Sequence, residues 1–265
     1  MTTFIHTTLP TVDGLTVTVN QGIAVLTLDR PHRRNALHRP LLDGLADVVG
    51  AVSAAAEVRV IVLTGSGGAF CAGGDLDSLK DMEGEEPSSA RVRMRREFST
   101  STRLLGSPKP TVAVIEGPAV GAGAALALAC DVRIGSPSAY FAAPFVSMAL
   151  VPDFGASWLF AEACGVARAK EIAMTGRRVY AEEALRIGLL HQVVDDPAAT
   201  AWATASALSA APVSAVRGTK ALVAQSLTRT LEEQIEREIE AQVEAVTSPE
   251  FAEHRAAWAR TVQKK

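Results

Sequence analysis

Residues 116–131, EGPAVGAGAALALACD, form the stretch of the chain that decides its fold. Gly117 and Pro118 end the apolar strand predicted just before them, and a helix with almost no side-chain bulk in its first turn begins near Gly121. The free N–H groups at such a helix N-terminus can bind an anion, or a carbonyl oxygen that becomes negative during a reaction. Close packing of a small-residue helix against a sheet explains the same residues equally well.

A second glycine-rich turn, GSGGAFCAGGD at residues 65–75, follows the apolar run VRVIVLT at residues 58–64. This run is typical of a strand that is buried on both faces of a parallel sheet. Apolar residues at helical spacing between positions 41 and 52 separate it from the β-type run at residues 23–28, so the pattern is β-α-β. Two strand-to-helix turns of this kind can hold one ligand oxygen with a backbone N–H group from each.

The composition indicates one large globular core and excludes several classes of protein. The chain has 265 residues, 48% of them apolar, and a formal net charge of −3, so neither nucleic acid nor an anionic membrane is expected as a partner. Its three cysteines, Cys71, Cys130 and Cys164, lack C-x-x-C spacing and predict reduced thiols rather than disulfides or a metal site. The N-terminus shows no signal-peptide pattern and the apolar runs are too short to span a bilayer, which predicts a soluble cytoplasmic protein.

Two segments of the chain carry several charged residues. The loop RPHRRNAL at residues 30–37 carries three arginines and a histidine, and such a loop can grip phosphate groups or can simply be solvated. The helix predicted at about residues 90–105 carries Arg91, Arg93, Arg95 and Arg96 and is expected to lie on the surface with a charged face. Most of the chain beyond residue 199 has a helical pattern.

Asp153 is the only acidic residue between Asp131 and Glu162, and it lies in the apolar segment LVPDFG at residues 150–155. An apolar setting disfavours the charged form of a carboxyl group, which suits a general base that must return its proton. The same residue is placed to cap the helix predicted to start near Ala156, a role that needs no chemistry. The residues alone leave both interpretations open.

Four stretches of the chain resemble the crotonase superfamily, also called the enoyl-CoA hydratase/isomerase family, in its order and spacing. They are LDRPHRRNAL at 28–37, LTGSGGAFCAGGDL at 63–76, EGPAVGAGAALALACD at 116–131 and MTGRRVYAEEALRIGLL at 174–190. The resemblance covers nearly the whole chain. It implies an α/β fold with a spiral of β-β-α repeats over residues 1–198, followed by a helical C-terminal trimerisation region over residues 199–265. A homotrimer, or a hexamer built as a dimer of trimers, is expected.

The resemblance implies a site for an acyl-CoA thioester, with coenzyme A present only as part of the substrate and with no metal or other cofactor. In this family the backbone N–H groups of two residues hold the thioester oxygen, and the matching positions here are Ala72 and Ala122. Asp153 matches the carboxylate position of isomerases in the family. The residues expected to contact the substrate are Arg33, Arg34, Ala36, Phe70, Ala72, Gly73, Gly74, Asp75, Leu76, Gly121, Ala122 and Phe145.

The positions that match the two water-handling glutamates of hydratases in this family hold Ala125 and Phe145. Neither side chain can accept or donate a proton, so the usual hydration chemistry is not expected. The resemblance, together with Asp153, favours an isomerase that shifts a double bond in an enoyl-CoA through an enolate held by backbone N–H groups. The alternatives are another crotonase-type enzyme, such as a thioesterase or a hydratase with relocated acids, and an acyl-CoA binding protein without catalysis.

Overall fold

The computed structural model describes residues 10–80 and 83–262, and its strands form two sheets. The main sheet has the order β1 (Leu15–Asn20), β2 (Ile23–Leu28), β3 (Val60–Gly65), β4 (Thr111–Ile115), β6 (Val132–Gly135) and β9 (Gln192–Val193). The second sheet has the order β5 (Pro118–Val120), β7 (Tyr140–Ala142) and β8 (Arg178–Tyr180). The β1–β2 hairpin is antiparallel, whereas the other pairs of the main sheet are parallel.

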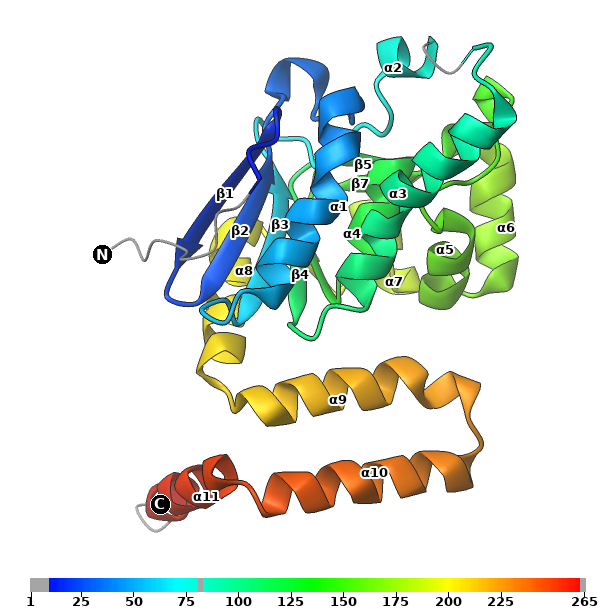
Figure 1. Ribbon diagram of the computed structural model, residues 1–265. Helices are drawn as coiled ribbons and strands as arrows, with labels where there is room; N and C mark the ends of the chain where they lie inside the picture. Colours follow the sequence, from blue (N-terminus) through cyan, green and yellow to red (C-terminus); the bar gives the residue numbers. More distant parts are fainter. Residues whose placement is uncertain (1–9, 81–82, 263–265) are drawn as a thin grey trace.

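Helices cover both faces of the main sheet, and a helical segment continues away from it (Figure 1). The helices of the core are α1 (Arg39–Ala54), α2 (Leu76–Lys80), α3 (Pro87–Leu105), α4 (Ala122–Leu128), α5 (Ala156–Cys164), α6 (Val166–Thr175), α7 (Ala181–Ile187) and α8 (Pro197–Ala210). They are followed by α9 (Val213–Gln225), α10 (Leu231–Val246) and α11 (Pro249–Val262). Short 3₁₀ turns are η1 (Pro31–Arg33), η2 (Pro144–Met148) and η3 (Ser226–Thr228). Within the described ranges, no helix is long and apolar enough to cross a membrane.

The chain alternates between the two sheets in a repeating order. β4 of the main sheet is followed by β5 of the second sheet and then by α4, and β6, β7 and α5 repeat the same β-β-α order. The turn after β3 also reaches the second layer, because Cys71 forms a parallel bridge with Ala119 of β5. This arrangement confirms the predicted spiral of β-β-α repeats, and it brings the two glycine-rich turns next to each other.

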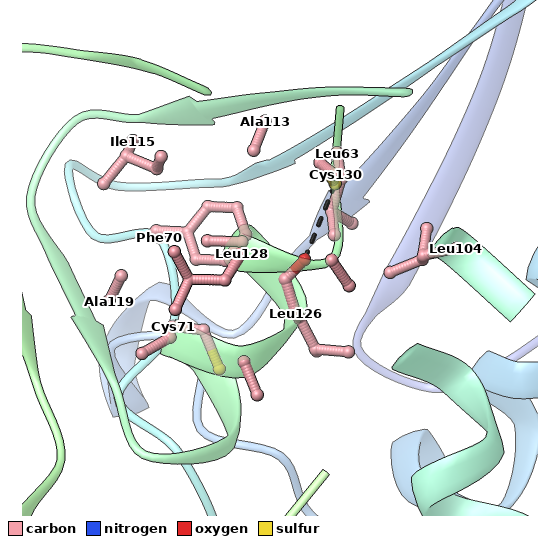
Figure 2. Packing of buried hydrophobic residues seen from close by; sticks show 14 of the residues in the cluster. Leu63, Phe70, Cys71, Leu104, Ala113, Ile115, Ala119, Leu126, Leu128 and Cys130 are labelled. Carbon is pink, nitrogen blue, oxygen red and sulfur yellow. Dashed lines mark hydrogen bonds between the residues drawn. The ribbon is translucent and has the colours of Figure 1, made fainter. Parts of the chain in front are cut away.

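The core on one face of the main sheet is built around α4, where small side chains allow a close approach. Figure 2 shows Phe70 and Leu126 among the buried side chains of this core. A Cβ atom at Gly123 would lie 2.5 Å from the carbonyl oxygen of Cys71, so no larger residue fits there. Close packing of the small-residue helix is therefore confirmed at this position. Phe70, which was expected to contact the substrate, is fully buried in this core instead.

The opposite face of the main sheet is covered by α8. Alternate residues of a strand point to opposite faces. Ile61 and Leu63 of β3 accordingly lie in the core around α4, while Val60 and Val62 pack with Ala201 and Ala205 of α8. The division predicted at residue 198 falls at the start of α8, and the helices that stand apart from the core begin with α9 (Figure 1).

Two elements differ from the sequence-based expectation. The Gly117-Pro118 pair was expected only to break a strand, yet Pro118 begins β5, where its lack of an N–H donor is tolerated at the first position. Helix α3 was expected to be a charged surface helix, but the Glu97 side chain is only 3% exposed and the Arg93 side chain only 8%. The helix therefore buries an ion pair, which lies close to the candidate site.

Candidate active site

Most of the predicted site residues line one cleft of about 350 Å³ at the ends of the glycine-rich turns. The predicted residues that line it are Arg33, Ala36, Ala72, Gly73, Gly74, Asp75, Leu76, Gly121, Ala122, Phe145 and Asp153. Two predicted residues do not line it, because the side chain of Phe70 is in the core and Arg34 is exposed on the loop beside it. Residues of the cleft that the sequence did not single out as contacts are Val120, Pro144, Met148 and Leu150.

The backbone N–H group of Ala72 is already used within the protein. It donates to the carbonyl oxygen of Arg34 at 3.0 Å, so it is not free to hold a ligand oxygen. The role predicted for Ala72 is corrected on this point. The family resemblance predicted a backbone donor in this turn. Which N–H group is free depends on how the turn pairs with the loop at residues 33–37, and the sequence does not show this pairing.

Gly74, two residues further along, has a free N–H group that can serve as the donor at the cleft. The N–H group of Leu37 donates to the Gly73 carbonyl oxygen at 2.8 Å, and the Asp75 N–H group donates to the Leu37 carbonyl oxygen at 3.0 Å. In such a parallel bridge the flanking residues face the partner, so the N–H group of the central residue Gly74 faces away from Leu37. Among the described residues it has no hydrogen-bond acceptor, and Gly74 lines the cleft.

The second donor of the cleft is the N–H group of Ala122, the first residue of α4. The first N–H groups of a helix have no acceptor within the helix. Gly121, just before it, has φ +56° and ψ −123°, a conformation that residues with a Cβ atom rarely adopt. The Gly121 N–H group itself donates to Ala142 of β7 at 2.9 Å, which anchors the turn to the second sheet.

Arg30, Asn35 and Asp75 fix the shape of the cleft wall. The Arg30 guanidinium donates to an Asp75 carboxylate oxygen at 2.9 Å and to the Ala36 carbonyl oxygen at 2.7 Å. The buried Asn35 amide donates to the carbonyl oxygens of Ser66 and Ala69, each at 2.8 Å. Burial alone would raise the pKa of Asp75, but the hydrogen bonds from Arg30 and from a backbone N–H group outweigh it and hold this pKa below its usual value. Asp75 is therefore an ionised structural group.

Asp153 differs from Asp75 in having no arginine or lysine paired with it among the described residues. Its Oδ1 atom is buried and makes no hydrogen bond to the described residues. Burial is the main cause that raises the pKa of Asp153 to about 6; a hydrogen bond from its own backbone N–H group opposes the shift, and the negative charge of Glu97 adds to it. The capping interpretation is wrong, because the N-cap of α5 is Gly155 and no side chain caps this helix. A half-buried carboxylate that lines a cleft and has one buried oxygen without a partner is typical of a functional group.

Ala125 and Phe145 stand where hydratases of the resembled family have acids, so Asp153 is the candidate for proton transfer in the cleft. Ala125 is fully buried inside α4, and Phe145 presents an aromatic side chain to the cleft. The carboxylates that line the cleft are those of Asp75 and Asp153, and Asp75 is paired with Arg30. The described part of the chain holds no group of three or more His, Cys, Asp or Glu side chains that suits a metal ion. The geometry thus offers one base beside two backbone N–H donors.

Comparison with known proteins identifies the family. The sequence pattern of the enoyl-CoA hydratase/isomerase family matches residues 18–264. The chain is 35% identical over 243 residues to 1,2-epoxyphenylacetyl-CoA isomerase of Escherichia coli K12, covering 91% of this chain and 93% of that protein. It is 36% identical over 251 residues to a Mycobacterium tuberculosis H37Rv protein named probable enoyl-CoA hydratase EchA14, covering 92% and 97%. The crystal structure of an enoyl-CoA hydratase from Polaromonas sp. JS666 has a TM-score of 0.88 at 30% identity, covering 93% and 97%. The chain belongs to the enoyl-CoA hydratase/isomerase family.

Proposed function

We propose that this protein is an acyl-CoA isomerase that shifts the double bond of an enoyl-CoA. The observation that carries the proposal is the unpartnered Oδ1 atom of Asp153, buried at a cleft that also holds the N–H groups of Gly74 and Ala122. A raised pKa makes a carboxylate a stronger base than an ordinary aspartate, while at pH 7 it is still mostly ionised. The donors suit an oxygen that gains negative charge in the transition state.

The reaction needs only these groups. With a 3-enoyl-CoA bound, Asp153 takes a proton from C2, and the electrons of that C–H bond form a dienolate whose negative charge resides mainly on the thioester oxygen. The N–H groups of Gly74 and Ala122 hydrogen-bond this oxygen. The protonated Asp153 then delivers the same proton to C4, and the double bond forms between C2 and C3. Atoms and electrons balance without water, metal or redox cofactor, and coenzyme A enters only as part of the substrate.

Hydration is the second candidate, because two of the three proteins compared above are named hydratases. Hydration of a double bond requires groups that activate water and deliver a proton to carbon. Ala125 and Phe145 supply neither, so Asp153 would have to do both. A panel of 2-enoyl, 3-enoyl and saturated acyl-CoAs, with products identified by mass and chromatography, separates the two reactions. Efficient formation of a 3-hydroxyacyl-CoA would favour the hydratase.

Asp153→Asn tests the base. The amide keeps the size of the side chain but cannot accept the proton, so turnover of a 3-enoyl-CoA should fall by roughly 10²- to 10⁴-fold. Acyl-CoA affinity should change little, because the backbone N–H groups are untouched. The matched control is Asp196→Asn, since Asp196 caps α8 by accepting from the Ala199 N–H group at 2.9 Å and Asn caps equally well. Turnover near the parent rate in Asp153→Asn would overturn the proposal.

The stability of the same variant provides a check with a defined sign. The pKa of Asp153 in the folded protein lies above its ordinary value of 3.8, so ionisation of this group lowers the free energy of unfolding as the pH rises from about 4 to about 6, and the penalty is complete above this range. The neutral Asn removes this penalty. The melting temperature of Asp153→Asn at pH 7.5 should therefore equal or exceed that of the parent, and a loss of activity cannot then be attributed to unfolding.

A further inference from the structure

Asp153 also lines a second, neighbouring cavity of about 190 Å³, which we call the inner cavity. Gly74, Asp75, Ala122, Leu150 and Asp153 line both spaces, so the proposed reaction centre lies where they meet. Much of the inner wall is apolar. Its charged and polar residues, besides Asp75 and Asp153, are Arg39, Ser78, Arg93 and Glu97.

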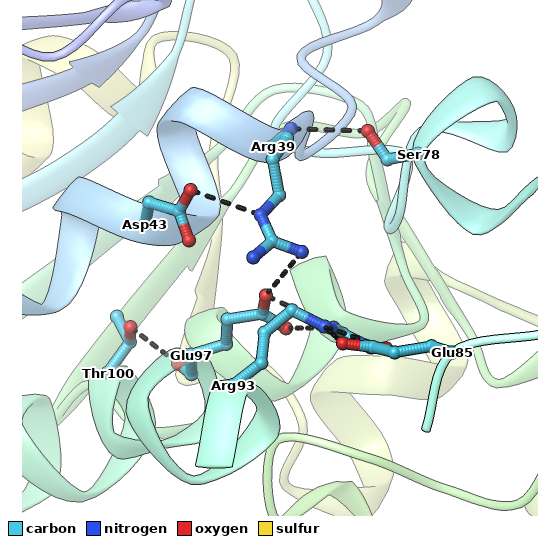
Figure 3. Close-up of polar contacts among 7 residues, drawn as sticks. All are labelled: Arg39, Asp43, Ser78, Glu85, Arg93, Glu97 and Thr100. Atoms are coloured by element: carbon cyan, nitrogen blue, oxygen red, sulfur yellow. Dashed lines mark hydrogen bonds and ion pairs between the residues drawn. The ribbon is translucent and has the colours of Figure 1, made fainter. Parts of the chain in front are cut away.

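Glu97 is held in the inner wall by two arginines (Figure 3). The Arg93 guanidinium donates to both carboxylate oxygens of Glu97, at 3.1 and 2.9 Å, and also binds Glu85 at 2.6 Å. Arg39 of α1 lies 3.8 Å from a Glu97 oxygen and hydrogen-bonds Asp43 at 3.0 Å. Each guanidinium is thus shared between two carboxylates. The cluster has three carboxylates for two guanidiniums, which leaves a net negative charge beside the inner cavity.

Helix α3 fixes this cluster relative to Asp153. The rings of Phe98, next to Glu97, and Phe154, next to Asp153, pack with their centroids 4.7 Å apart. Glu97 itself is almost completely buried, and water does not screen a buried charge as it screens a surface charge. Glu97 therefore lies near Asp153 in the fold, and the surroundings of low polarity strengthen the electrostatic interaction between the two carboxylates.

We propose that Glu97 is a positioning residue that acts through Asp153, its negative charge across the inner cavity keeping Asp153 a strong base. The proposal rests on the proposed function, since it assumes that Asp153 is the base. The pKa of Asp153 is raised mainly by burial, is lowered by a hydrogen bond from its own backbone N–H group, and is raised further by the Glu97 charge, which agrees in direction with the proposal. The charged groups that face Asp153 or Glu97 are Arg33 of η1, Arg39 and Asp43 of α1, Asp75 before α2, and Arg93 of α3.

Glu97→Gln removes the charge and keeps a group that can accept from Arg93. Asp153 then loses a like-charged neighbour and ionises more readily, so the acid limb of kcat/KM against pH moves to lower pH. We expect kcat/KM on the acid limb, expressed relative to its plateau, to rise about twofold or more. A purely structural role of Glu97 would lower activity and melting temperature without moving the limb.

Asp47→Asn is the matched control, because Asp47 pairs with Arg96 in the same contact between α1 and α3, at 2.8 Å, but is exposed and lies outside the inner cavity. Its acid limb should match that of the parent. If the Gln variant does not fold, Glu97→Met combined with Arg93→Met serves, since apolar residues often replace a buried ion pair as a whole without loss of stability, whereas removal of one partner is strongly destabilising. It should shift the limb in the same direction.

The outcomes separate this inference from the proposed function. An unmoved acid limb in folded Glu97→Gln, or in folded Glu97→Met combined with Arg93→Met, with Asp153→Asn inactive, would overturn the role of Glu97 and leave Asp153 as the base. Parent-like turnover in Asp153→Asn would overturn both. A limb that moves to the same extent in Asp47→Asn would show a general effect of surface charge and would also overturn the proposal.

Discussion

At the scale of single residues, the pH dependence of activity follows from the state of Asp153. A base must be ionised to act, and the pKa of this carboxyl is raised to about 6 by its burial. We therefore expect kcat/KM to be nearly constant between about pH 7 and 8 and to fall about tenfold per pH unit below about 6. Initial rates with a 3-enoyl-CoA across this range, with circular dichroism to confirm folding at the acid end, measure the profile. An acid limb near pH 4, the range of an ordinary exposed aspartate, would contradict the environment described for Asp153.

The sequence could predict that Asp153 is unusual, because a lone acid in an apolar segment is visible in the chain itself. It could not decide between a cap and a base, since that choice depends on where α5 begins and what surrounds the carboxylate. The same limit applies to the donor in the glycine-rich turn at residues 65–75. Ala72 and Gly74 are both small residues of one turn, and only the bridge to Leu37 shows which N–H group remains free.

At the scale of elements, the turn into α4 depends on the backbone conformation of Gly121. A Cβ atom at this position would be 3.8 Å from the Phe145 ring, so there is space for it, but φ +56° with ψ −123° is strained for alanine. Gly121→Ala should therefore lower the free energy of unfolding by about 1–3 kcal/mol and turn the Ala122 N–H group away from its present direction. Urea denaturation measures the first effect, and the kcat of the folded fraction measures the second.

Gly218→Ala is the comparison for this prediction. Gly218 lies within α9, has no neighbouring atom within 4 Å of an added Cβ, and has ordinary helical φ. Alanine favours the helix by about 1 kcal/mol over glycine. This variant should be neutral or slightly more stable with unchanged activity. Equal losses in both glycine variants would show that the conformation of Gly121 has no special role.

Helix α3 shows why some elements escape prediction by pattern. Its sequence is rich in arginine, and helical periodicity alone places charged residues on a solvent face. The burial of Glu97 depends instead on α1, which supplies Arg39, and on the segment before α3, which supplies Glu85. These partners are far from one another in the chain or lie in a loop. Local spacing contains no information on them.

At the scale of the whole molecule, the order of strands and helices was largely predictable. Strands that are buried in a parallel sheet consist of continuous runs of apolar residues, and this pattern predicted β3 and β4. The second sheet was harder, because β5, β7 and β8 have three residues each and too few positions to show a period. Its arrangement follows from the family resemblance and from the pairing of Cys71 with Ala119, which joins the turn after β3 to it.

Assembly into a trimer or hexamer remains a prediction, and the surface of α10 makes it testable. Leu231, Ile235, Ile239 and Val243 recur every four residues along this helix, and all four are exposed in the single chain. A contiguous apolar stripe on helices that stand apart from the core is typical of a surface that a partner covers. We expect light scattering at micromolar concentration to give the mass of three or six chains.

Ile235→Glu combined with Ile239→Glu should reduce this mass, because each substitution would bury an unpaired charge at the contact. Glu240→Gln, on the same helix but outside the stripe, should keep the parent mass. A monomeric parent protein would refute the assembly, and an unchanged mass in the double variant would place the contact elsewhere than on α10.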